Sequence, residues 1–296
     1  MSYTSCNLCA RLCGVNREAG EVGYCRMGAT PVIARAALHM WEEPIISGFR
    51  GSGTIFFSGC SLGCVFCQNS RISGGECGVA VTTERLCGIM LELWEQGAHN
   101  INLVTPTHFS PSIREAVLLA KKKGLNVPIV YNTGTYETRE ALAALEGVVD
   151  VYMPDLKYYR SETAGKYSAA SDYPDVARAA IAEMVRQRGA PVIENGIMKS
   201  GVIVRILLLP GHVAEAKLSL KYLLDRYGDK IYVSLMSQYT PMKGQEPPLD
   251  RRVTHREYEE LVDYAVKCGL KNGFIQEWGS AEESFIPRFD NTGVLK

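Results

Sequence analysis

The sequence has no surplus of charge of either sign and no long hydrophobic run. Its 296 residues carry 32 basic and 32 acidic side chains, so no overall field attracts the chain to nucleic acid or to an anionic membrane. No stretch approaches the roughly eighteen apolar residues of a membrane-spanning helix. The first residues also lack the basic and then apolar order of a secretory signal. These absences predict a cytoplasmic protein without a membrane or nucleic-acid partner.

The chain is not short, and its ten cysteines therefore do not indicate a disulfide framework. Such frameworks are typical of small secreted chains without a core of their own, whereas 296 residues can bury a large core. In a reducing compartment, clustered cysteines more often hold metal. Cys77, Cys87 and Cys268 have no partners by spacing and are interpreted as buried hydrophobic residues. The other cysteines form two clusters.

The first cluster is Cys60, Cys64 and Cys67, directly after the strand-like run at residues 54–57. A 4Fe-4S cluster needs a ligand on each iron, usually four cysteines, so three cysteines leave one iron open to an external ligand. Gly59 and Gly63 permit the tight backbone that wraps such a cluster. A zinc knuckle or buried cysteines are the alternatives, but a knuckle normally draws four ligands from paired units. The triplet therefore predicts a reactive iron–sulfur cluster.

The second cluster is Cys6, Cys9, Cys13 and Cys25, all within the first twenty-five residues. Four thiolates with short gaps suit a tetrahedral zinc ion or a fully ligated iron–sulfur cluster, and both remain open. Either would staple a segment that is too short to build its own core. Residues 1–50 are accordingly predicted to be a metal-stapled, Cys-rich N-terminal extension.

The rest of the chain alternates between apolar runs and amphipathic stretches. The runs lie at residues 54–57, 100–105, 127–132, 148–155, 202–209 and 231–238. Near-continuous apolarity is typical of parallel strands that are buried on both faces. The stretches between them show helical periodicity and end at glycines, which are Gly97, Gly124, Gly147, Gly189, Gly228 and Gly269.

This alternation predicts an α/β fold, a partial (β/α)6 TIM-like barrel over residues 51–296 with a C-terminal extension. A seventh strand is possible at residues 272–278, and Asn195-Gly196 indicates a hairpin before the fifth strand. In such folds, the loops at the carboxyl ends of the strands carry the chemistry. Asp155, Lys157 and Arg205 lie there on apolar runs, where charged groups need an ion-pair partner or a ligand.

The triplet in its strand context resembles the signature of the radical S-adenosylmethionine (SAM) superfamily. From about Gly53 to Pro241 the chain is similar to the pyruvate formate-lyase activating enzyme group. The resemblance implies that the amine and carboxylate of SAM chelate the fourth iron and that Phe66 packs beside the adenine. It also implies that Arg205 and Lys157 meet the SAM carboxylate or ribose, and that Met153 and Asp155 hold a monovalent cation near SAM.

Two segments depart from that group. Its Gly-Gly-Glu after the second strand, which receives the methionyl amine, is replaced by the segment from Thr105 to His108. Its Asp-Thr-Asn-Gly after the third strand is replaced by residues 131–134, which contain Asn132. By position, Thr105, His108 and Asn132 are candidate cofactor contacts. His108 is a proton donor, a substrate contact or a satisfied loop residue.

By this resemblance the chain is predicted to be a radical SAM enzyme. It would cleave SAM reductively at a 4Fe-4S cluster and give a 5′-deoxyadenosyl radical that abstracts hydrogen, with a glycyl-radical enzyme as protein substrate. A flavodoxin or ferredoxin would supply the electron. Radical modification of another peptide, a tRNA or a small molecule is one alternative. An iron–sulfur electron-transfer or sensor protein without SAM chemistry is another.

Overall fold

Parallel strands form the centre of one large sheet in the computed structural model, which describes residues 2–276 and 287–295. The strands are β1 (Val32–His39), β2 (Ser52–Phe57), β3 (Val79–Ala80), β4 (Ile101–Val104), β5 (Ile129–Thr133), β6 (Val151–Pro154), β7 (Val192–Glu194), β8 (Ile197–Leu207), β9 (Tyr232–Met236) and β10 (Gly273–Ile275). Their order is β10-β9-β8-β6-β5-β4-β2-β1-β3, and β7 pairs with β8. From β2 to β10 along this path, every neighbouring pair is parallel.

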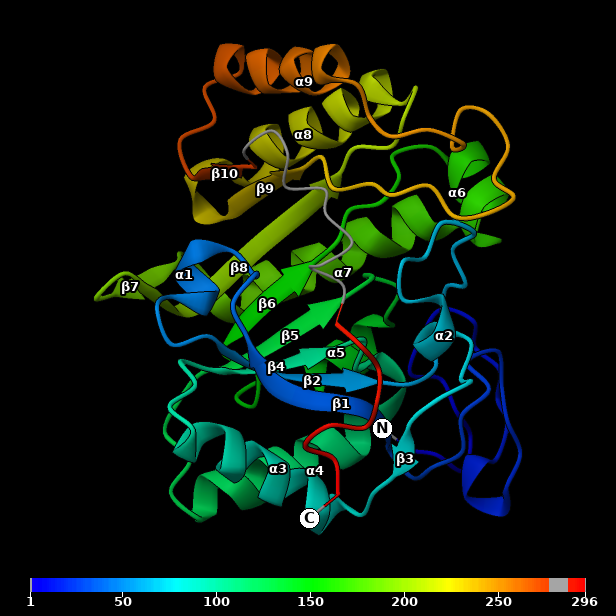
Figure 1. Ribbon diagram of the computed structural model, residues 1–296, viewed down its shortest axis with the longest axis vertical. Helices are drawn as coiled ribbons and strands as arrows, with labels where there is room; N and C mark the ends of the chain where they lie inside the picture. The colour runs from blue at the N-terminus through cyan, green and yellow to red at the C-terminus, as the bar shows by residue number, and fades with distance from the viewer. Residues whose placement is uncertain (1, 277–286, 296) are drawn as a thin grey trace.

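Helices connect successive strands and cover the sheet. The α-helices are α1 (Pro44–Ser47), α2 (Ser70–Ser73), α3 (Thr83–Glu95), α4 (Ser110–Lys122), α5 (Arg139–Ala143), α6 (Ser161–Ser168), α7 (Tyr173–Arg188), α8 (Val213–Tyr227) and α9 (His255–Lys267). Short 3-10 turns lie at Arg17–Ala19, Thr107–Phe109 and Gly228–Lys230. Figure 1 shows α3 and α4 together near one end of the sheet and α8 and α9 near the other. No described helix has the length and apolarity needed to cross a membrane.

The predicted alternation of strands and helices is confirmed. All six predicted strands are present, and β10 occupies part of the possible seventh, of which residues 277–278 lie outside the described residues. The hairpin at Asn195-Gly196 joins β7 to β8, and both residues have the positive φ that its tight turn needs, 51° and 77°. The chain is thus a mixed α/β fold with a parallel sheet, as expected for a partial barrel.

Sequence reasoning missed β1 and β3. The β1 strand pairs antiparallel with β2 along most of its length, from Ile33 opposite Phe57 to His39 opposite Ser52. Its sequence, with three alanines and an arginine, lacks the apolar run that marked the parallel strands. The second half of the predicted extension 1–50 therefore continues the main sheet.

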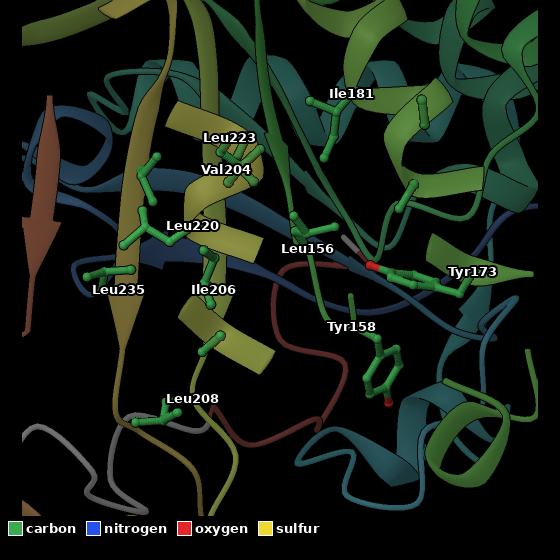
Figure 2. Close-up of a cluster of buried hydrophobic side chains, with 14 of the residues drawn as sticks. Leu156, Tyr158, Tyr173, Ile181, Val204, Ile206, Leu208, Leu220, Leu223 and Leu235 are labelled. Carbon is green, nitrogen blue, oxygen red and sulfur yellow. The ribbon is translucent and has the colours of Figure 1, made fainter. Parts of the chain in front are cut away.

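The largest hydrophobic cluster fills the space between the sheet and the helices α7 and α8. Figure 2 shows Val204 and Ile206 of β8 and Leu235 of β9 facing Leu220 and Leu223 of α8. All five side chains are at most 2% exposed. Burying a leucine or valine of this kind contributes about 1.5–3 kcal/mol to stability. This packing holds the strand ends of β6, β8 and β9 in a fixed relation.

Candidate functional site

The cysteine triplet lies on the loop that follows β2, at the carboxyl end of a parallel strand. Gly59 and Gly63 of this loop have φ values of +84° and +79°, in the left-handed region that glycine adopts without strain. Burial, with a contribution from neighbouring thiols, raises the pKa of Cys60 to about 12 and also raises the pKa of Cys67. Such thiols stay protonated at neutral pH unless a metal binds them.

Gly59 has no room for a side chain. An added Cβ would overlap Cγ of Met27 and would lie 2.8 Å from the carbonyl oxygen of Cys25. We expect Gly59→Ala to displace the cysteine loop and to lower the free energy of unfolding by at least about 1–3 kcal/mol. Chemical denaturation measures the change. Gly147→Ala is the control, because Gly147 also has a positive φ but no atom near its added Cβ; equal effects in both would contradict the crowding argument.

Beside the cysteine loop lies a cavity of about 660 Å³, a volume typical of sites for small molecules. Cys64, Phe66 and Cys67 form part of its wall. The strand ends of β5, β6 and β8 contribute polar and charged side chains, which are Asn132, Asp155, Lys157 and Arg205. The structure therefore brings together residues that the sequence separates by more than a hundred positions.

The charged residues of the cavity form one ion-pair network. Arg205 donates from Nε to Oδ1 of Asp155 at 2.8 Å and from Nη2 to Oδ1 of Asn132 at 2.6 Å. Lys157 donates from Nζ to Oδ2 of Asp155 at 2.6 Å. Burial alone would raise the pKa of Asp155, but the two cations beside it hold that pKa below its usual value. Each oxygen of Asp155 thus accepts a hydrogen bond from one cationic side chain.

Glu42 completes this network and was missed by sequence reasoning. It lies between β1 and α1, lines the cavity, and places Oε2 3.5 Å from Nη1 of Arg205. Its Oε1 accepts from Nδ2 of Asn102 at 2.9 Å. Burial raises the pKa of Glu42 to about 7, although Arg205 opposes this shift. Nothing in the local sequence marks this glutamate, because β1 itself was not recognised.

Phe66 packs in an aromatic group next to the cavity. Its ring meets those of Tyr158, Tyr167 and Tyr239 in edge-to-face geometry, with centroids 6.1–6.4 Å apart. The side chain is 6% exposed and still reaches the cavity wall. The three tyrosine rings fix the position of Phe66 at the cavity wall.

Met153, Thr105 and His108 are not part of the cavity wall. Met153 is fully buried and packs in a small apolar cluster with Ile46 and Val130. The backbone amide of Thr105 donates to the carbonyl of Asn132. His108 is 1% exposed and lies behind the cysteine loop, where its Nε2 is 2.6 Å from the carbonyl oxygen of Ser58. The structure thus places His108 against the backbone that leads into the triplet.

His108 should make stability depend on pH. Burial lowers its pKa to about 3, whereas an unfolded histidine titrates near 6.5. Below about pH 6.5 the unfolded chain binds a proton that the folded chain excludes, so stability falls as pH falls, by at most about 1.4 kcal/mol per unit. Between about pH 7 and pH 5 we expect the metal-free protein to lose about 2 kcal/mol more than a His108→Gln variant in urea unfolding. Equal losses of unfolding free energy in the two proteins would contradict this prediction.

The N-terminal cysteines lie near one another. Burial raises the pKa of Cys9 to about 12, and the thiols of Cys6, Cys13 and Cys25 are close enough to add to that shift. Cys13 is exposed, while the other three are buried. Over residues 2–276 and 287–295, no three histidine, cysteine or acidic side chains converge as ligands of a single metal ion.

The triplet is suited to a cluster rather than to a single ion. In a 4Fe-4S cluster each thiolate binds its own iron, so the three sulfurs need not converge on one point, and soft thiolates favour iron–sulfur ligation. The raised thiol pKa values and the glycine-permitted loop fit such a group. Three cysteines at the end of the first parallel strand, beside a cavity with a buried ion-pair network, define a class of cluster-dependent α/β enzymes.

Comparison with known protein families agrees with this class of enzyme. Residues 54–223 match the family model described as the Radical SAM superfamily, which covers more than half of the chain. The chain belongs to the radical SAM superfamily. Enzymes of this superfamily use a 4Fe-4S cluster and SAM, and the chain is therefore a radical SAM enzyme. Its assignment to the pyruvate formate-lyase activating group is a finer question.

Individual relatives support the fold. An uncharacterized protein of Methanocaldococcus jannaschii, MJ0674, is 31% identical over 280 residues, 90% of this chain and 76% of that protein. Streptococcus suis SuiB, solved with bound S-adenosylmethionine, is similar with a TM-score of 0.51 and 12% identity, over 75% of this chain and 49% of SuiB. A radical SAM methyltransferase from Sphaerobacter thermophilus is similar with a TM-score of 0.53 and 17% identity, over 76% of this chain and 66% of the methyltransferase. The chain spans about half the length of SuiB. Because the sequence identities are only 12% and 17%, these two structures show the fold alone.

Proposed function

We propose that this radical SAM enzyme is similar in function to the pyruvate formate-lyase activating group and that Cys60, Cys64 and Cys67 ligate its cluster. The observation that carries the proposal is that one cavity is walled both by the cysteine loop and by the network around Asp155 and Arg205. When bound and reduced, the cluster supplies the electron that cleaves SAM and so initiates hydrogen abstraction.

In this proposal, different residues of the cavity contact different parts of SAM. Lys157 and Arg205 are cations that remain charged, since Asp155 raises the pKa of each against the effect of burial. They are suited to the methionyl carboxylate or the ribose hydroxyls. Asn132 is held by Arg205 and presents an amide to the same space. Phe66 offers a flat apolar contact for the adenine.

Thr105 and His108 take indirect roles in this proposal. His108 donates to the carbonyl of Ser58 and so steadies the loop that bears the cysteines. The amide of Thr105 ties the end of β4 to β5. A monovalent cation beside Met153 and Asp155 would require Asp155 to share an oxygen that now accepts from a cation. Met153 could contribute only its backbone, because its side chain lies in the core.

The N-terminal extension, residues 1–50, is proposed to hold a second metal, zinc or an iron–sulfur cluster, on Cys6, Cys9, Cys13 and Cys25. The clustering of the four cysteines and the burial of Cys6, Cys9 and Cys25 support it. The side chains of the four cysteines would have to rotate to bring the sulfurs onto one centre. Metal binding would offset the cost of burying these thiols and would fasten the segment to the barrel.

A glycyl-radical enzyme is the proposed protein substrate, and a flavodoxin or ferredoxin the proposed electron donor. The glycyl-radical enzyme is supported by the resemblance of the motifs around the triplet and Asp155 to those of the pyruvate formate-lyase activating group. The balance of 32 basic and 32 acidic residues disfavours tRNA, which is bound through clusters of lysine and arginine. Another peptide or a small molecule remains the competing substrate.

Anaerobic reconstitution tests the proposal. We expect a bound 4Fe-4S cluster whose paramagnetic signal shifts when SAM is added, and formation of 5′-deoxyadenosine with dithionite. Measuring the iron and zinc bound per chain then distinguishes a protein with one cluster and one zinc ion from a protein with two clusters. A peptide whose only glycine carries deuterium at the α-carbon tests the finer claim: transfer of deuterium to 5′-deoxyadenosine supports glycine as the target. SAM cleavage without that transfer would reject the glycyl-radical assignment, and an unchanged signal with no cleavage would reject SAM chemistry at this site.

A further inference from the structure

Arg11, on the N-terminal segment between Cys9 and Cys13, joins three parts of the chain. Its Nε donates to the carbonyl of Ser61 at 2.9 Å, and its Nη2 donates to the carbonyl of Leu62 at 3.2 Å. Both acceptors belong to the cysteine loop. The same guanidinium donates to the carbonyls of Ser168 at 3.1 Å and Ala169 at 2.6 Å, at the end of α6. One side chain therefore fixes the cysteine loop to the end of α6.

Two tyrosines hold the guanidinium in place. Its central carbon lies 3.8 Å from the ring centroid of Tyr24 and 5.2 Å from that of Tyr136. The hydroxyl of Tyr24 donates to the carbonyl of Leu62 at 2.9 Å, so the carbonyl that Arg11 binds has a second donor. Figure 1 shows the dark blue N-terminal segment on the same side of the molecule as α2, which follows the cysteine loop.

The contacts of Arg11 lead directly to the triplet. Ser61 and Leu62 follow Cys60, and the amide of Leu62 lies 3.4 Å from the sulfur of Cys60. The hydroxyl of Ser168 donates to the sulfur of Cys64 at 2.9 Å, while Arg11 binds the carbonyl of that same serine. Arg11 thus orients the backbone beside one cysteine and a hydrogen-bond donor to another.

The charge of Arg11 is not neutralised by an acid. In the part of the chain that the structure describes, all of its hydrogen bonds go to backbone carbonyls, and it forms no ion pair. A cation held near sulfur ligands stabilises the more negative state of the group that they bind. Accepting one electron from an external donor makes an iron–sulfur cluster more negative by one charge.

We propose that Arg11 is a positioning residue of the cysteine loop and that its charge favours the reduced cluster. This inference rests on the proposed function of Cys60, Cys64 and Cys67. The N-terminal extension thereby contributes directly to the site of SAM cleavage, independently of whatever metal its own cysteines bind. Arg11 itself is not expected to touch SAM.

Two variants separate the charge of Arg11 from its geometry. Arg11→Gln removes the charge, and we expect a tenfold lower ratio of reduced to oxidised cluster at a fixed potential, which corresponds to a midpoint about 59 mV lower for a one-electron couple. Arg11→Lys keeps the charge but loses the planar fork, so its midpoint should stay near that of the wild type. Both variants should lose iron to a chelator about tenfold faster, as is typical when a partner of a metal ligand is removed.

The measurements are a dithionite-mediated redox titration followed by paramagnetic resonance and a time course of iron release. Arg26→Gln is the matched control, because the side chain of Arg26 is exposed and its one hydrogen bond to the described residues is long, 3.4 Å, to the carbonyl of Gly74 outside the triplet. It should match the wild type in both measurements. Equal midpoints and equal iron release in Arg11→Gln and Arg26→Gln would overturn the proposal, as would a midpoint shift of the same size in both.

A milder change keeps the test informative if Arg11→Gln does not fold. Tyr24→Phe removes only the donor to Leu62 and should speed iron release severalfold without moving the midpoint. Iron release at the wild-type rate in both Tyr24→Phe and Arg11→Lys would also overturn the proposal. The proposed function fails in a different way, because the wild-type protein would then bind no cluster or would show no response to SAM.

Discussion

Replacing Cys64 with alanine is expected to reduce 5′-deoxyadenosine formation from SAM to the level seen without enzyme. The triplet has no spare ligand, since a three-cysteine site already leaves one iron for SAM. Losing a second ligand exposes another iron, so the cluster should be lost or should bind in an incompetent form. Iron content after anaerobic reconstitution and product formation with dithionite measure the two effects separately.

Cys268→Ala is the matched control for this prediction. The interpretation of Cys268 as a buried residue is wrong, because it is exposed at the end of α9. It is not among the residues that line the cavity, so the same change in side chain occurs outside the site. Iron content and SAM cleavage should equal those of the wild type. Persistent SAM cleavage by the Cys64→Ala protein would reject the assignment of the cluster to this loop.

The second large effect is expected for Arg205→Gln. Arg205 contacts Asp155, Asn132 and Glu42 in a cavity where water cannot replace it fully, and its side chain is only 13% exposed. Removing it takes the cationic partner from Glu42 and leaves Asp155 paired with Lys157 alone. Breaking a buried pair in this way typically costs about 3–5 kcal/mol of stability. We also expect the affinity for SAM to fall by at least about tenfold, or 1.4 kcal/mol.

Chemical denaturation and calorimetric titration with SAM measure these two losses. Arg186→Gln is the control, because Arg186 forms its ion pairs with Glu146 and Glu183 while its own side chain is 50% exposed. Its affinity for SAM should not change. If Arg205→Gln bound SAM as tightly as the control, the network would be a structural feature of the barrel alone.

Much of the fold follows from local patterns. The buried parallel strands are continuous apolar runs, and the helices between them end at glycines, so their existence could be read from periodicity. The β1 strand could not be recognised in this way. Its residues gain their strand conformation by pairing with β2 on one side and β3 on the other, a long-range effect that local composition does not record.

The candidate site also contains residues that the sequence predicts and residues that it does not. The triplet is evident in the sequence because its three cysteines lie within eight residues on one loop, and Asp155 and Arg205 are conspicuous as charges on apolar strands. Their direct ion pair was one of the interpretations open beforehand, and the structure shows it. The contribution of Glu42 was not predictable, since it depends on the pairing of β1 with β2 and on the packing of α1 against β8. The same holds for Arg11, whose partners lie about 50 and 157 residues away.

By itself the sequence determined the class of this protein, because the cysteine spacing and the order of strands and helices are local properties of the chain. Tertiary structure decided which side chains share the cavity and which do not. It placed Glu42 against Arg205, buried His108 behind the cysteine loop and brought Arg11 to the triplet. The physical reason is that charge pairing and burial depend on distances in space, which packing of the whole sheet establishes and sequence spacing does not.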